Sequence, residues 1–134
     1  MTTLFPRQLA CHLLLVLGAL FAAHSHAAPV AALKGDPVAG KRAFYRCASC
    51  HQVGPSARAG FGPKLTGIIG RKAGSTTDYR YSVAMKNANI VWTEQNLAGF
   101  LKAPSDFIPG NNMRFWGIGN AQQMADLLAY LRTQ

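Results

Sequence analysis

The run Cys47-Ala48-Ser49-Cys50-His51 constrains this chain more than any other part of its sequence. A C-x-x-C-H run is typical of a c-type haem attachment site. Residues three and four apart lie on one face of a helix, so both thiols and the imidazole are expected to point the same way. Thiols placed in this way can form thioethers with the haem vinyl groups, and the imidazole can bind the iron.

The same run has three other interpretations, namely a thioredoxin-like redox pair, half of a zinc site and a structural disulfide. A zinc site would need further ligands, and a thioredoxin-like pair would need a βαβ pattern that this sequence lacks. Haem attachment is therefore the favoured interpretation.

The first 27 residues have the pattern of a secretory signal peptide. Arg7 precedes an apolar run over Leu9–Ala23, and the small residues Ser25 and Ala27 mark a cleavage site. The run is short for a membrane span. We expect cleavage after Ala27, export to the periplasm and no stable membrane insertion, with an uncleaved anchor as the alternative.

Removal of 27 of the 134 residues would leave 107, enough for one small domain at 35–134 after a short tail at 28–34. His51 would then be the only histidine, so two histidines of the same chain could not both bind the iron. The sixth ligand would have to be methionine, lysine, an external group or nothing.

The chain is basic, with a formal net charge of +9 that becomes +8 if Arg7 leaves with the leader. A basic surface can indicate nucleic acid, an anionic membrane or an acidic protein as partner. No dense run of Lys and Arg occurs, and export argues against nucleic acid. The sequence therefore favours an acidic protein partner or a merely solvated surface.

Short helices separated by Gly-rich and Pro-rich loops are predicted. Asp36 is a good N-cap before Pro37, and their helix should run through Phe44 and carry the haem motif at its end. A second short helix is expected at 83–87. No segment alternates well enough to predict a strand.

Two further helices have clear start signals. Thr93 caps a helix that should end before Pro104. Asn120 with Gln123 resembles a capping box that opens the last helix. The apolar stripe of that helix consists of Met124, Leu127, Leu128 and Leu131. The predicted fold class is all-α, and a large apolar cofactor would supply buried surface that a short chain lacks.

Three methionines beyond the leader could complete the iron site. Methionine is usually core filler, and Met124 lies in the apolar stripe while Met85 lies in a predicted helix. Met113 follows the turn-rich segment 108–112, which can direct one side chain inward without helical constraint. Met113 is therefore favoured, followed by Met85 and then Met124. Methionine opposite histidine is a known haem pairing that raises the reduction potential.

Several further motifs occur in a fixed order along almost the whole of 35–134. They are Gly40-x-x-x-Phe44, Cys47-x-x-Cys50-His51, Gly62-Pro63-Lys64-Leu65, Gly70-Arg71, Tyr81-Ser82, Trp92, Ile108-Pro109-Gly110-x-x-Met113, Phe115 and Asp126-Leu127-Leu128-Ala129-Tyr130-Leu131. With this set the chain closely resembles the class I c-type cytochromes, the soluble mitochondrial cytochrome c and bacterial cytochrome c2 type. The resemblance implies four to five short helices and long loops wrapped around one covalently bound haem c.

The resemblance also assigns roles. Cys47 and Cys50 would hold the haem, with His51 and Met113 as axial ligands of the iron. The carbonyl of Pro63 would accept the second ring N–H of His51 and so orient it.

Other residues are assigned to the haem propionate and to the helix crossing. Arg71, Tyr81 and Trp92 would hydrogen-bond a buried propionate, which is costly to bury unless it is paired. The first and last helices would cross with Gly40 and Phe44 against Leu127 and Tyr130.

The sequence departs from the family pattern at several positions. Phe100 stands where the family often has a tyrosine near the methionine sulfur, so we expect an altered reduction potential and pH behaviour. Asn112 replaces a usual lysine. Further lysines expected around the haem edge are absent at Gly60, Ser105, Gly119 and Asn120. These absences put a docking face like that of the mitochondrial protein in doubt.

The resemblance implies a periplasmic monohaem electron carrier rather than an enzyme, because both axial positions would be filled by the protein. Its partners would be redox proteins, with a dehydrogenase or bc1-type complex as donor and an oxidase or reductase as acceptor, and it would be a monomer. Two alternatives stay open. One is a fixed haem subunit of a larger oxidoreductase, and the other is a ligand-binding or peroxidase-like protein with an open sixth site.

Overall fold

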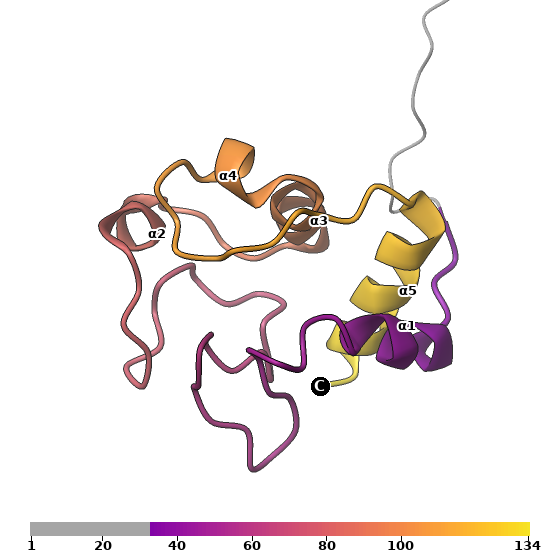
Figure 1. Ribbon diagram of the computed structural model, residues 1–134. Helices are drawn as coiled ribbons and strands as arrows, with labels where there is room; N and C mark the ends of the chain where they lie inside the picture. Colours follow the sequence, from indigo (N-terminus) through magenta and orange to yellow (C-terminus); the bar gives the residue numbers. More distant parts are fainter. Residues whose placement is uncertain (1–32) are drawn as a thin grey trace, which may run out of the picture.

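The computed structural model describes residues 33–134, and this part of the chain is all-α, as predicted. Its five helices are α1 (Pro37–Phe44), α2 (Val83–Asn87), α3 (Glu94–Lys102), α4 (Pro104–Phe107) and α5 (Ala121–Arg132) (Figure 1). Within 33–134 the only strand-like pairing is an isolated bridge between Lys72 and Val91. The predicted signal peptide and most of the predicted tail lie outside the described residues.

Helix α1 begins as predicted but ends before the haem motif. The Asp36 side chain accepts a hydrogen bond from the Val38 N–H at 2.8 Å, and Pro37 occupies the first turn. The prediction that this helix carries the motif at its end is wrong, since the helix stops at Phe44 and tight turns follow. The Cys47 N–H donates to the carbonyl of Phe44, three residues earlier, at 2.7 Å. Such a bond is typical of a 3₁₀ turn, which is narrower than a turn of α-helix.

A single helix-like turn nevertheless keeps the motif together. The N–H groups of Cys50 and His51 both donate to the Cys47 carbonyl oxygen, at 3.0 and 2.9 Å. The expectation that both thiols and the imidazole face one side therefore holds without a regular helix.

The predicted caps of the later helices are confirmed. The Thr93 hydroxyl accepts from the Asn96 N–H at 3.1 Å, and α3 ends at Lys102, before Pro104. Pro104 then opens the four-residue α4, which was not predicted because so short a helix has no readable periodicity.

Helix α5 also begins as predicted. The Asn120 side chain accepts from the Gln123 N–H at 2.9 Å, although within 33–134 no return bond from the Gln123 side chain completes the capping box. The predicted stripe of α5 is buried, and Leu127 is fully enclosed.

Helices α1 and α5 cross at close range, as the resemblance implied. A Cβ on Gly40 would collide with the carbonyl oxygen of Asp126, so only glycine allows this approach. The Phe44 and Tyr130 rings lie 5.5 Å apart between centroids, and the Asp36 N–H donates to the Asp126 carboxylate at 2.8 Å. This pair of helices forms one end of the molecule (Figure 1).

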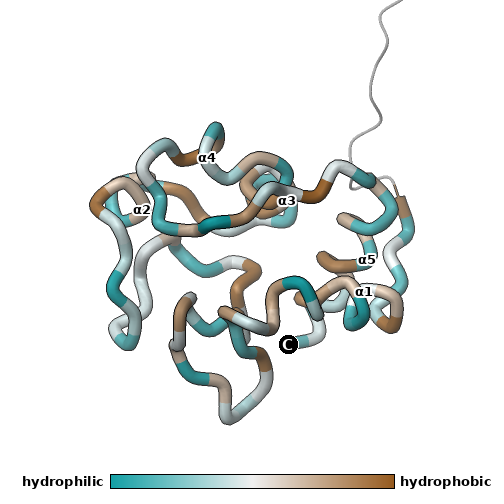
Figure 2. Tube along the Cα trace, viewed as in Figure 1, coloured by the Kyte–Doolittle hydropathy of each residue, from teal (hydrophilic) through white to brown (hydrophobic). Residues whose placement is uncertain are grey.

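The remaining helices and the long loop of 45–82 enclose the interior. Helices α2, α3 and α4 lie on one side and this loop on the other (Figure 1). Apolar segments are interleaved with polar ones along the whole trace rather than gathered on one element (Figure 2). In 33–134, no helix is long and apolar enough to span a bilayer.

Candidate haem-binding site

A cavity of about 450 Å³ opens inside the apolar core, within the size range of ligand pockets. All eight residues predicted for the site line it. They are Cys47, Cys50, His51, Pro63, Arg71, Tyr81, Trp92 and Met113. The structure therefore brings together the complete predicted set from six separate places in the sequence.

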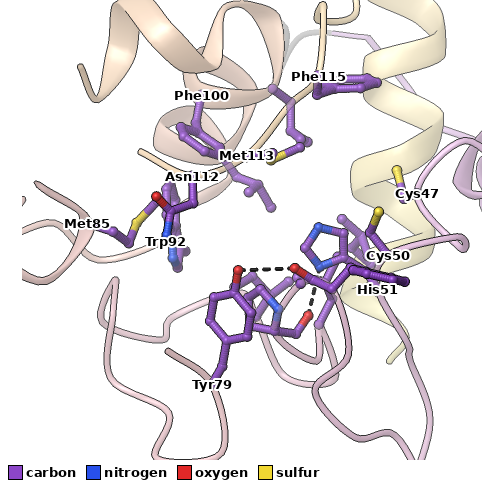
Figure 3. A pocket seen from close by; sticks show the side chains of 18 of the residues that line it. Cys47, Cys50, His51, Tyr79, Met85, Trp92, Phe100, Asn112, Met113 and Phe115 are labelled. Carbon is purple, nitrogen blue, oxygen red and sulfur yellow. Dashed lines mark hydrogen bonds between the residues drawn. The ribbon is translucent and has the colours of Figure 1, made fainter. Parts of the chain in front are cut away.

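The imidazole of His51 is held in one orientation (Figure 3). Its Nδ1 lies 2.7 Å from the carbonyl oxygen of Pro63, and because a carbonyl only accepts, Nδ1 carries the proton and Nε2 keeps its lone pair. Burial lowers the pKa of His51, with the Pro63 hydrogen bond acting in the opposite direction. Burial thus favours the neutral imidazole that a metal requires.

Gly62 makes room for that imidazole. A Cβ at this position would come within 2.7 Å of the His51 Nδ1 and 2.8 Å of its Nε2. The Gly62 N–H also donates to the Cys50 carbonyl at 2.9 Å, which fastens this loop to the haem motif. Gly62 and Pro63 therefore act together on the His51 ring: the glycine leaves room for it, and the proline carbonyl accepts its hydrogen bond.

The two thiols lie on the same wall as the imidazole, and both are free. Cys47 is half-buried and Cys50 is exposed at the open side of the cavity. Burial raises the pKa of the Cys47 thiol, while the positive charge of Arg46 acts in the opposite direction. No group of three metal-binding side chains occurs in the described part of the chain, so nothing there completes a zinc site.

The three candidate methionines occupy different places. Met113 projects into the cavity from the side facing His51 (Figure 3), and its N–H donates to the Asn111 side chain at 2.8 Å. Met85 also lines the cavity, further from His51 (Figure 3). Met124 is 2% exposed inside the core and does not reach the cavity wall.

The wall on the Met113 side is apolar. Phe100 is buried and packs against Trp92 with ring centroids 5.1 Å apart. Leu97 and Leu101 of α3 line the same region. No hydroxyl is available from Phe100, so the departure from the family pattern noted in the sequence leaves this wall without that donor.

Two of the residues predicted for the propionate carry donors beside the cavity. Arg71 donates to the carbonyls of Thr66 at 3.1 Å and Lys64 at 2.8 Å, which leaves further N–H groups of its five-donor guanidinium. Burial lowers the pKa of Arg71, and within 33–134 no carboxylate forms a salt bridge with it. The indole N–H of Trp92 also has no acceptor among these residues.

Tyr81 differs, since its hydroxyl pairs with the Thr76 hydroxyl at 2.9 Å. Sequence reasoning overlooked its neighbour Tyr79, which lines the cavity and donates to the Phe61 carbonyl at 3.1 Å (Figure 3). The two tyrosine rings meet edge to face at 4.8 Å. Tyr79 lies in a bend of an irregular loop, so the local sequence pattern carries no signal for its place at the cavity.

These residues fit a haem. The groups around the apolar hollow are two thiols and an imidazole on one wall, a thioether facing them, and the guanidinium of Arg71 and the indole of Trp92 beside them. In an all-α fold this arrangement defines a protein that holds haem c covalently through its cysteines.

Comparison with known proteins gives the same result. The sequence model of the cytochrome c family matches residues 37–134. The chain is 46% identical over 100 residues to cytochrome c2 of Rhodomicrobium vannielii, across 75% of this chain and 80% of that protein. It is 48% identical over 101 residues to cytochrome c2 of Agrobacterium tumefaciens, across 73% and 91% respectively.

A solved structure agrees as well. Cytochrome cH from Methylobacterium extorquens matches with a TM-score of 0.71 and 37% identity, over 75% of this chain and all of that one. The chain belongs to the cytochrome c family, as a class I c-type cytochrome with covalently attached haem c. It is an electron carrier and not an enzyme.

Proposed function

We propose that this protein is a periplasmic monohaem carrier that moves single electrons between two larger redox proteins. The observation that supports this best is the placement of His51 and Met113 on facing sides of one cavity (Figure 3). With a protein ligand on each side, the iron has no open position for a substrate. This favours electron transfer over catalysis or ligand binding.

The residues of the site have distinct roles in this proposal. Cys47 and Cys50 would hold the haem covalently, His51 and Met113 would bind its iron, and Pro63 fixes the orientation of the imidazole. The bound haem supplies an iron that cycles between its ferrous and ferric states. The protein holds both ligands in place through that cycle and excludes water from the apolar wall.

Arg71, Tyr81 and Trp92 are proposed to hold the propionates. A carboxylate in an apolar hollow is costly to bury without donors. The spare N–H groups of Arg71 and the unpaired indole of Trp92 offer such donors directly, whereas the Tyr81 hydroxyl would have to share its bond with Thr76. We therefore expect Arg71 and Trp92 to contribute more than Tyr81.

An absorption spectrum of the oxidised holoprotein, matured in a bacterium with haem-attachment machinery, tests the proposal. A thioether-to-iron charge-transfer band is expected, and Met113→Ala should abolish it and lower the potential while the haem stays attached. Met124→Ala is the matched control and should keep the band, because Met124 does not line the cavity. A band that survives Met113→Ala would transfer the ligand role to Met85. Rapid carbon monoxide binding by the reduced wild type would indicate an open sixth site instead.

Location, haem content and mobility need separate measurements. Fractionation of the native cell should place the protein in the periplasm, with its mature chain beginning after Ala27. A haem-to-chain ratio of one is expected for the monohaem assignment. A small monomer on gel filtration of the periplasmic extract would support a free shuttle, whereas elution with a large complex would indicate a fixed subunit.

A further inference from the structure

Three exposed aromatic side chains line the cavity or directly adjoin residues that line it. Trp116 is fully exposed, Phe61 is 88% exposed and Tyr45 is 77% exposed. We call these three residues the aromatic rim. Single exposed apolar residues are ordinary, but a group of large ones next to a functional site is typical of an interaction surface.

The rim is tied to the cavity by contacts and by sequence. Phe61 lines the cavity itself, and Trp116 directly follows Phe115, which also lines it. Tyr45 directly precedes Arg46, another lining residue. The Arg46 guanidinium lies over the Phe115 ring at 5.5 Å from its centroid, so the segments carrying Tyr45 and Trp116 are neighbours in space.

The backbone that carries Trp116 is firmly held. Gly117 has a φ of 99° and packs so tightly against the Lys102 carbonyl that a side chain would collide with it. The N–H of Ile118 donates to the Leu101 carbonyl at 2.9 Å, and Ile118 is 3% exposed. A fixed aromatic loses little freedom when it binds a partner, which strengthens association.

The side chain of Trp116 does not contribute to the packing of the fold. Its side chain is fully exposed, and within 33–134 it pairs with no other ring. Tryptophan is among the side chains most enriched at the energetic centres of interfaces. Its place at the rim is therefore explained by contact with another molecule rather than by folding.

The charged side chains near the aromatic rim indicate which kind of surface a partner must have. Arg46 and Arg114 are exposed on the cavity wall, and none of the lining residues is acidic. Two carboxylates elsewhere are engaged in salt bridges, Asp78 with Lys64 and Glu94 with Arg132. The complementary surface is an apolar patch bordered by carboxylates.

We propose that Trp116 anchors the docking of a redox protein whose contact surface is an apolar patch edged with acidic residues. The inference rests on the proposed carrier function, because tunnelling slows steeply with distance and makes the open side of the cavity the useful contact face. The residues that line the cavity include arginines and aromatics but no lysine. Binding should therefore depend on apolar contact and only modestly on salt.

Quinol-driven reduction of the purified holoprotein by native membrane vesicles, washed free of soluble cytochromes, tests this. Trp116→Ala should raise KM about tenfold or more, the effect of losing an aromatic hot spot, with kcat nearly unchanged. Trp116→Phe should restore most of the loss. Val83→Ala, which removes a 75% exposed apolar side chain on α2 that does not line the cavity and has no arginine beside it in the sequence, is the matched control and should leave KM unchanged.

Three further readouts separate docking from other effects. The reduction potential and the denaturation midpoint of Trp116→Ala should equal those of the wild type, since the side chain packs against nothing. The KM ratio between the two proteins should persist at high ionic strength, because salt screens charges and not apolar contacts. Equal KM values, or a ratio that vanishes with salt, would overturn the docking proposal. Failure of the wild type to accept electrons from any vesicle preparation would instead overturn the carrier function, and docking with it.

Discussion

The clearance between Gly62 and the His51 ring makes a sharp prediction about Gly62→Ala. The added Cβ would lie 2.7 Å from Nδ1 and 2.8 Å from Nε2, whereas non-bonded carbon contacts are comfortable at about 3.5–4.0 Å. The loop or the ring must therefore move by roughly 1 Å. The loop cannot yield freely, because the Gly62 N–H is bonded to the Cys50 carbonyl at 2.9 Å and Pro63 to His51 at 2.7 Å.

The cost follows from what such a movement breaks. Loss of the bond between Pro63 and the His51 ring costs about 1–3 kcal/mol, since it leaves a part-buried polar group unsatisfied. Overpacking adds roughly 1–3 kcal/mol. We expect Gly62→Ala to lower the free energy of unfolding of the holoprotein by about 2–5 kcal/mol in guanidinium titrations. The reduction potential should also change, because the imidazole proposed to bind the iron is displaced.

Gly60→Ala is the matched control in the same loop. Only the Cys50 carbonyl oxygen lies near its added Cβ, at 3.8 Å, so the change should stay within about 0.5 kcal/mol. If Gly62→Ala were as stable as Gly60→Ala and kept the wild-type potential, the argument that Gly62 gives clearance to the imidazole would be refuted.

Two other perturbations are informative. Glu94→Gln should cost about 0.5–1 kcal/mol at neutral pH, because Arg132 binds both carboxylate oxygens, at 2.7 and 2.8 Å, on a partly exposed surface. The Arg132 hydrogen bond lowers the pKa of Glu94 in the folded protein. The stabilisation by this ion pair is therefore present above the pKa that Glu94 has in the unfolded chain, and it is lost as the pH falls through the pKa in the folded protein. A difference in unfolding free energy between the two proteins that does not shrink in acid would contradict this. Removal of the haem should unfold the domain, since an empty hollow of about 450 Å³ costs on the order of 10 kcal/mol, as much as a small domain's whole stability. Native near-UV circular dichroism of the haem-free chain would disprove this.

The sequence revealed most of the helices because their ends carry chemical signals. Asp36, Thr93 and Asn120 were recognisable as N-caps, and each accepts the expected backbone hydrogen bond. The helix boundary at Phe44 was not recognisable, since nothing in the local pattern distinguishes a regular helix from the tight turns that follow. The four residues of α4 are too few for any periodicity.

The site was predictable to a different degree for each kind of residue. The spacing of Cys47, Cys50 and His51 by itself predicts covalent haem attachment. Met113 could be favoured as a ligand because its loop is free of helical constraint. Arg71 and Trp92 could be chosen only through resemblance to a family, because a lone arginine or tryptophan in a loop has no local signature. Their place at the cavity, and the N–H groups that Arg71 has left after its two bonds to carbonyls, emerge only from the folded arrangement.

The aromatic rim illustrates the limit of reading a sequence. Trp116 lies between Phe115 and Gly117, and in an apolar pattern each aromatic would be assigned to the core. The structure instead buries Ile118 and leaves Trp116 fully exposed, while Gly117 between them has a positive φ and packs against the Lys102 carbonyl. Which of these neighbouring apolar side chains is exposed depends on the folded path of the backbone, and the sequence pattern alone does not reveal it. Because an exposed tryptophan adds no buried surface to the fold, its apolar side chain is available for binding a partner instead, as the docking proposal requires.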